Sequence, residues 1–165
     1  AGLFCFRPEI WDRLEKVKPS PRGEYELTDA IAATLEAGRR IRAFELSGYW
    51  VNLTGPEDFL QANGFRLAEL LSARGADPAA RIPCAVHPTA RVEGAEIGPN
   101  VSVGPRCRIQ PGARVQDAVL LEDALVEQRA VVRHAVLGAG ARVPSGGRLE
   151  GTPREAAVLL DGQTC

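Results

Sequence analysis

The sequence predicts an α/β segment followed by a parallel β-helix, and three observations support this fold class. From residue 86 to residue 149, aliphatic side chains recur at steps of six residues, with occasional steps of five. Members that stand three places apart in this series are seventeen residues apart in the sequence, as at Val92, Ile109, Val126 and Val143. A triangular coil with three short strands per turn produces this spacing, because each strand points one aliphatic residue inward. Residues 1–73 instead mix helix and strand patterns. The predicted inward residues are Val86, Val92, Ile97, Val103, Ile109, Val115, Leu120, Val126, Val132, Leu137, Val143 and Leu149.

The first part of the chain begins with a strand pattern and a helix pattern. Residues 1–6 (AGLFCF) form an apolar run typical of a strand. Residues 8–17 carry Pro8 early and place Ile10, Leu14 and Val17 on one side, which predicts an amphipathic helix.

Two further helices and two short strands are expected before the repeats. The helix within residues 23–38 can be capped by Thr28 or Asp29 and can end at Gly38. Residues 40–46 and 49–53 have strand patterns. Residues 54–75 predict a longer helix that begins at Thr54 or Gly55. Residues 74–85, which are dense in Gly, Ala and Pro, are interpreted as a linker.

Other positions of the repeat fit a triangular coil. Small residues recur four positions after most inward aliphatic residues, as a tight interior corner requires. Gly98, Gly104 and Gly138 follow inward residues directly and are expected to supply positive φ at corners. The arginines take outward positions, which we interpret as a solvated charged surface, with an anion or regulator site at a subunit contact as the alternative. These arginines are at positions 91, 106, 108, 114, 129, 133, 142 and 148.

Composition restricts the class of protein. The chain has 165 residues, 45% hydrophobic content and a formal net charge of −1, which is ordinary for a soluble globular protein and gives no support for nucleic-acid binding. No apolar run approaches the length of a membrane span, so we expect no membrane partner and a cytoplasmic location. The four cysteines lack zinc-type spacing and are interpreted as reduced thiols.

The repeat resembles the hexapeptide repeat of left-handed parallel β-helix proteins. The resemblance covers residues 86–149, and the left-handed sense is implied by it rather than by the spacing. Aliphatic, uncapped ends of the stack favour self-association, so a homo-oligomer is expected. In the tail, residues 150–165, the segment AAVLL is expected to cap the last coil.

The N-terminal part resembles the sugar-1-phosphate nucleotidyltransferases, also called NDP-sugar pyrophosphorylases. The strings AGLFCFRPEI, PSPRGEYELTDAI and GYWVNLTGPEDFLQAN look like three successive motifs of that family, which commonly carries a C-terminal β-helix. The resemblance implies that residues 1–73 are the sugar-side half of the catalytic α/β domain, and that residues 86–149 serve assembly or regulation. It also implies that the complete enzyme joins a nucleoside triphosphate and a sugar 1-phosphate into a nucleotide sugar and pyrophosphate.

The same resemblance assigns roles to four residues. Gly2 is implied to approach the sugar through its backbone, and Glu24 and Glu26 to face or support the sugar-phosphate pocket. Asn52 falls where the family usually places an Asp ligand to Mg²⁺. Because an amide oxygen brings a dipole where a carboxylate brings a charge, Asn52 is expected to bind Mg²⁺ more weakly.

The family's Gly-rich nucleotide loop, G-x-G-T-R, is absent from these 165 residues, as are the catalytic lysine and aspartate that accompany it. We therefore expect no catalytic residue in this chain and no turnover by the chain alone. A non-catalytic scaffold or regulatory subunit is the main alternative. A hexapeptide acyltransferase, with His87 or His134 as the base, is the less favoured one.

Overall fold

The computed structural model describes residues 3–73 and 83–165, which fall into two compact units that divide between Trp50 and Val51. Each unit has its own internal packing. Gly2 and most of the predicted linker lie outside the described residues.

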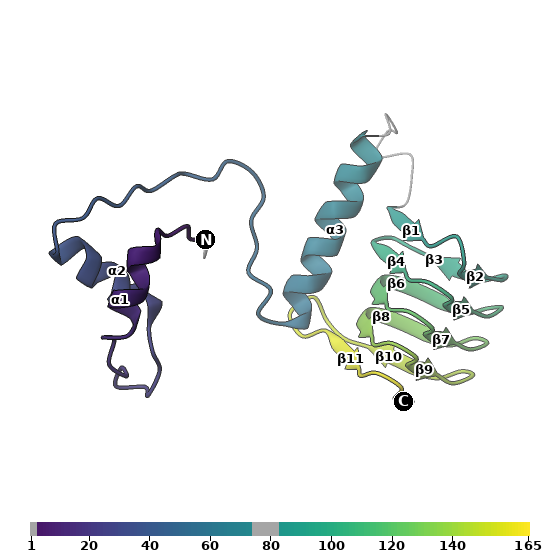
Figure 1. The fold of residues 1–165 in the computed structure, drawn as a ribbon. Coiled ribbons are helices and arrows are strands. Elements are labelled where there is room, and N and C mark those ends of the chain that lie inside the picture. The colour runs from purple at the N-terminus through teal and green to yellow at the C-terminus, as the bar shows by residue number, and fades with distance from the viewer. Residues whose placement is uncertain (1–2, 74–82) are drawn as a thin grey trace. The chain divides into compact units, whose positions relative to one another are not determined.

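The first unit contains three short helices. They are η1 (Pro8–Ile10), α1 (Trp11–Leu14) and α2 (Leu27–Glu36) (Figure 1). The α2 helix begins after Glu26, without a side-chain hydrogen bond at that cap, so the predicted caps Thr28 and Asp29 lie inside its first turn. Gly38 ends it as expected, with φ of 72°.

The strand predictions for the first unit are wrong in the described residues. Leu3–Phe6, residues 40–46 and residues 49–50 are irregular, and so are residues 51–53 at the start of the second unit. An isolated strand leaves its backbone donors and acceptors unpaired, and no sheet of the described residues includes these runs. Many large apolar side chains consequently remain exposed in this unit, among them Leu3 at 74% and Phe44 at 82%.

The second unit is a parallel β-helix with three faces. The first face is the four-stranded sheet β2 (Arg91–Val92), β5 (Arg108–Ile109), β7 (Leu125–Val126) and β9 (Arg142–Val143). The second face is formed by β3 (Glu96–Ile97), residues 114–116 of β6 (Arg114–Leu120), residues 131–133 of β8 (Val131–Leu137) and β10 (Arg148–Glu150). The third face is formed by β1 (Cys84–Val86), β4 (Val101–Val103), residues 118–120 of β6, residues 135–137 of β8 and β11 (Ala157–Leu159). Figure 1 shows these strands as successive layers of one stack.

The pairing register confirms the predicted repeat. Val92 pairs with Ile109, Ile109 with Val126 and Val126 with Val143, so that strands of the first face stack at the seventeen-residue period. Eight predicted inward residues are buried, and those at the ends of the stack are partly exposed. The eight are Val103, Ile109, Val115, Leu120, Val126, Val132, Leu137 and Val143.

The corners of the coil differ in detail from the prediction. Gly98 has positive φ as expected, but Gly104 and Gly138 do not. A Cβ on Gly104 would lie 2.8 Å from the Leu120 carbonyl oxygen, so this glycine permits close approach of the next coil. Left-handed φ recurs instead at Asn100, Asp117 and His134. Asn and Asp tolerate this region better than most residues, because their side chains hydrogen-bond locally.

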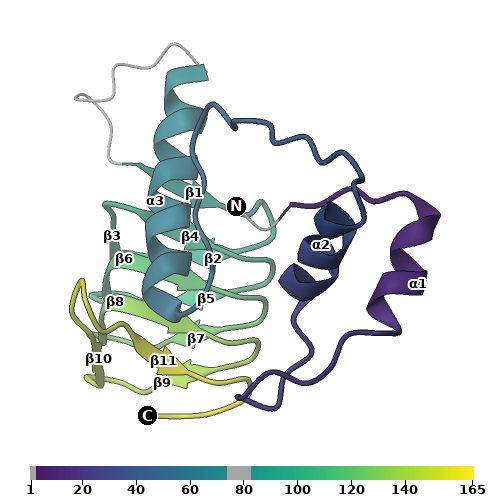
Figure 2. The same cartoon turned by 90° about the vertical axis from the view of Figure 1, so that its left-hand side faces the viewer.

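The helix α3 (Pro56–Ala73) lies along the third face (Figure 2). Its Asn63 amide donates to the Asn100 carbonyl at 3.1 Å and accepts from the Ser102 hydroxyl at 2.5 Å. Near the other end of the stack, the Ala156 N–H donates to the Glu57 carboxylate at 2.9 Å. The helix α3 was assigned to the N-terminal domain, yet it packs on the β-helix. The domain boundaries at residues 73 and 85 stay a prediction. No helix in the described ranges is both long enough and apolar enough for a bilayer crossing.

The tail completes the stack as expected. The β11 strand pairs with β8, and Leu159 is only 6% exposed. Leu159 aligns with Leu137, twenty-two residues earlier, so the last turn holds five residues more than the seventeen-residue period. These additional residues form the turn that donates to Glu57.

The start of α3 is held by Asp58. Its carboxylate accepts from the Thr54 N–H at 2.9 Å, the Thr54 hydroxyl at 2.5 Å and the Gly55 N–H at 3.2 Å. The Thr54 hydroxyl, together with the two N–H groups, holds the pKa of Asp58 below its ordinary value of 3.8, because these donors favour the charged carboxylate.

This cap predicts a defined acid sensitivity. Because the folded pKa is the lower one, the stabilisation is fully present above pH 3.8 and is lost as the pH falls through the folded pKa. The protection of the backbone amides of residues 55 and 57–59, relative to their intrinsic exchange rates, is expected to fall in that acid range. The variant Asp58→Asn should already show faster exchange at neutral pH and little further change on acidification. Equal acid dependence in the two proteins would contradict the assignment.

Candidate functional site

Of the residues assigned to sugar-phosphate binding, Glu26 lines an open hollow in the first unit, whereas Glu24 does not. Lys18, Ser20, Arg22, Glu26 and Asp29 line it, on the turn before α2 and the first turn of that helix. Asp29 lies in the first turn of α2. The Ser20 hydroxyl is buried and has no hydrogen-bond partner among the described residues. The hollow thus offers two cations, a carboxylate pair and a hydroxyl that can still accept and donate.

Arg22 connects the two assigned glutamates. Its guanidinium lies 2.6 Å from the Glu26 carboxylate and 3.8 Å from that of Glu24. The Glu26 side chain is 26% exposed, whereas Glu24 is 66% exposed. Sequence reasoning missed Arg22, because residues 22–26 precede α2 and the four-residue spacing of helical ion pairs does not apply there. The arrangement fits recognition of hydroxyl groups by the carboxylates and of a phosphate by the arginine.

Asn52 lies in the second unit, on the exposed segment that leads into α3. The nearby carboxylate of Asp58 is engaged in capping that helix. No group of three or more His, Cys, Asp or Glu side chains suited to a metal ion occurs in residues 3–73 and 83–165. The described residues therefore do not build a magnesium site by themselves, and Asn52 offers one neutral oxygen. Gly2, the remaining assigned residue, lies outside the described residues.

The two histidines have local partners. The Nδ1 atom of His87 lies 2.9 Å from the Thr89 hydroxyl. The Nδ1 atom of His134 lies 3.8 Å from the Asp117 carboxylate at a corner of the coil, where the His134 side chain is 24% exposed. Both arrangements are adequately explained by the local turns, and neither supplies an argument for acyl transfer.

Two family models match the chain, in the order that the sequence predicts. The model described as Nucleotidyl transferase matches residues 1–69, and the model described as GMPPB C-terminal domain matches residues 81–162. The chain belongs to the sugar-1-phosphate nucleotidyltransferases. The resemblance inferred from three short motifs and a repeat is confirmed at this level. The matches establish the family relationship. The reaction and the ligands of the complete enzymes are taken up as a proposal below.

Individual relatives agree with this family assignment. The low-salt glycan biosynthesis nucleotidyltransferase Agl11 of Haloferax volcanii is 44% identical over 62 residues, which are 38% of this chain and 17% of the relative. The bifunctional protein GlmU of Methanococcus maripaludis is 37% identical over 103 residues, or 61% of this chain and 24% of the relative. A glucose-1-phosphate thymidylyltransferase of Streptomyces griseus is 39% identical over 62 residues, or 38% and 18%. The chain therefore spans about a fifth of the length of these relatives.

Proposed function

We propose that this chain is the sugar-side part of an enzyme that joins a nucleoside triphosphate and a sugar 1-phosphate into a nucleotide sugar and pyrophosphate. The observation that carries the proposal is the ordered match to a nucleotidyltransferase model and then to a β-helix model of the same kind of enzyme. In this proposal the substrates are those two phosphate compounds, and the β-helix serves assembly into a homo-oligomer or regulation.

Glu24 and Glu26 are proposed to accept hydrogen bonds from the sugar, with Gly2 approaching it through the backbone. Arg22 holds Glu26 in place, since the pair is close and Glu26 is the less exposed of the two carboxylates. The reaction itself is an in-line attack on phosphorus, so the protein contributes mainly positioning and charge. Magnesium is typical of the family, and Asn52 is proposed as one of its ligands. We derive no step through the ion, because the described residues do not complete its site.

A non-catalytic scaffold is supported by a different observation. The second unit, residues 51–165, has a buried core of its own, so the β-helix does not need the proposed sugar site in order to fold. A subunit that acts through this β-helix would tolerate Asn at the magnesium position. In that case the protein would assemble but would not release pyrophosphate.

The proposal is tested with the product of the complete open reading frame. Sequencing of the DNA before the Ala1 codon shows whether a G-x-G-T-R loop is encoded in frame, and pyrophosphate release then measures activity on sugar 1-phosphates. Glu26→Gln is expected to lower kcat/KM for the sugar 1-phosphate about tenfold or more, because a charge-assisted hydrogen bond is lost. Glu36→Gln, at the end of the same helix, is the matched control and should leave kcat/KM unchanged. No pyrophosphate release by the unmodified protein, or equal activity of the two variants, would overturn the proposed role.

A further inference from the structure

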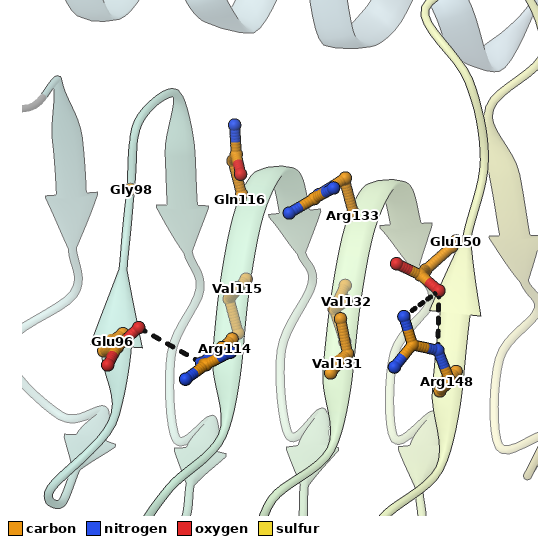
Figure 3. Close-up of a pocket in the computed structure, with 10 residues that line it drawn as sticks. All are labelled: Glu96, Gly98, Arg114, Val115, Gln116, Val131, Val132, Arg133, Arg148 and Glu150. Atoms are coloured by element: carbon orange, nitrogen blue, oxygen red, sulfur yellow. Dashed lines mark hydrogen bonds and ion pairs between the residues drawn. The ribbon is translucent and has the colours of Figure 1, made fainter.

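A groove lies on the second face of the β-helix, outside the proposed sugar site. Its volume is about 310 Å³, and its charged lining comes from β3, β6, β8 and β10. Three arginines border it, namely Arg114, Arg133 and Arg148 (Figure 3). The groove is therefore a concave, positively charged feature on a surface for which the sequence favoured a solvated role and left an anion or regulator site at a subunit contact as the alternative.

The register of the strands explains why the groove exists. Arg114, Val131 and Arg148 align across β6, β8 and β10. Adjacent strands lie about 4.8 Å apart, so the two arginine backbones are separated by about 10 Å with a short apolar residue between them. The short Val131 side chain leaves space between two long cationic side chains. In the neighbouring column, Arg133 aligns with Gln116 and Glu150 and adds a third cation beside that space.

The ion pairs in the groove are partial. Arg114 lies 3.3 Å from Glu96, and Arg148 lies 2.7 Å from Glu150. Arg133 has no ion-pair partner among the described residues, so the five charged groups sum to +1. Because Arg114 and Arg148 are 70% and 64% exposed, their pairs contribute little and can exchange for a stronger acceptor.

We propose that this groove binds a small phosphate-bearing anion. A guanidinium group presents a planar pair of donors that matches phosphate oxygens, and three arginines line this one concave surface. The volume is at the lower end of the roughly 300 to 1,000 Å³ found for ligand pockets, which fits a sugar phosphate or pyrophosphate better than a large ligand. This inference does not rest on the proposed nucleotide transfer, since none of the groove residues belongs to the first unit.

Calorimetric titration of the purified chain tests the proposal, with inorganic pyrophosphate and glucose 1-phosphate as the two probes at low ionic strength. We expect saturable binding of at least one probe. Tighter binding of pyrophosphate would identify the ligand as a free inorganic anion, and tighter binding of glucose 1-phosphate would identify it as a sugar phosphate. Arg133→Ala and Arg148→Ala should each weaken binding about tenfold, because each removes a charge-assisted donor pair. Arg133→Lys should restore only part of the loss, since lysine lacks the planar donor pair.

Arg91→Ala is the matched control, because Arg91 is an exposed arginine on the first face and its loss changes the net charge equally. It should leave the affinity within about twofold, which distinguishes a local site from general attraction of anions. Circular dichroism of each variant verifies that the β-helix is intact. Absence of binding by the unmodified chain, or equal weakening by Arg91→Ala, would overturn the proposal. A change of oligomeric state in the groove variants without anion binding would also overturn it, and would assign the groove to a contact between copies.

Discussion

Leu137→Ala is expected to lower the free energy of unfolding of the β-helix by about 2 to 5 kcal/mol, because truncation of a buried leucine loses contacts and leaves a cavity. Leu137 is fully buried, and in the register it is stacked between Leu120 and Leu159. The backbones of the flanking coils are fixed by parallel hydrogen bonding on both sides. The coil therefore has little freedom to collapse into the space, which places the effect in the upper part of that range.

Urea denaturation followed by circular dichroism measures this effect. Leu160→Ala is the appropriate control, since Leu160 is the same residue type in the last coil but is 60% exposed. Its loss should change the free energy of unfolding by less than about 0.5 kcal/mol. Similar values for the two variants would mean that the stacked column is not the main source of stability.

Val119→Asp is expected to release α3 from the β-helix without unfolding the coil. Val119 lies at an outward position of the third face, between the inward residues Ala118 and Leu120, yet it is only 6% exposed. Since α3 packs against β6, we attribute this burial to α3. An unpaired carboxylate at that position costs several kcal/mol when buried, and undocking of the helix returns it to water. Exchange protection across residues 56–73 should fall by about two orders of magnitude, while protection of the buried coils is retained.

Leu125→Asp is the control for the release of α3. Leu125 also lies at an outward position, but on the first face, in β7. Its substitution should leave the protection of α3 unchanged. Loss of protection throughout the β-helix in Val119→Asp would show that the coil cannot fold without its helix, which contradicts the independence assumed here.

The β-helix was predictable because its information is repeated. Each turn places an aliphatic residue at the same inward position, so an error at one position is corrected by its neighbours in the column. The corners carry less information, since left-handed φ is accepted by several residue types. Asn100, Asp117 and His134 occupy one corner column although their side chains differ in chemistry. Gly104 instead lies where the next coil approaches closely, and its position in the repeat does not distinguish this role from that of a glycine with positive φ.

The first unit was less predictable because strands depend on distant partners. The apolar run at Leu3–Phe6 has a strand pattern, but pairing requires a neighbour, and the described residues of the first unit provide none. The proposed sugar site has the same limitation. Glu24 and Glu26 were assigned from a motif, while the contribution of Arg22 became visible only when the turn placed its guanidinium against Glu26.

The docking of α3 did leave a signal in the sequence. The third face has five outward positions, and none of them is charged, in contrast to the arginines and glutamates that prevail elsewhere. They are Ala85, Ser102, Val119, Val136 and Val158. An apolar column on the outside of a coil indicates that another element covers it. The pattern was visible, but the six-residue period draws attention to inward residues only.

The length of α3 sets a limit on how far this β-helix can grow. Its 18 residues extend about 27 Å at 1.5 Å per residue. The five strands of the third face, spaced at about 4.8 Å, extend about 19 Å. One duplicated coil would raise that height to about 24 Å and remain within the helix, whereas a second would reach about 29 Å and leave an apolar layer uncovered. Lineages that add coils by internal duplication would have to lengthen this helix in step.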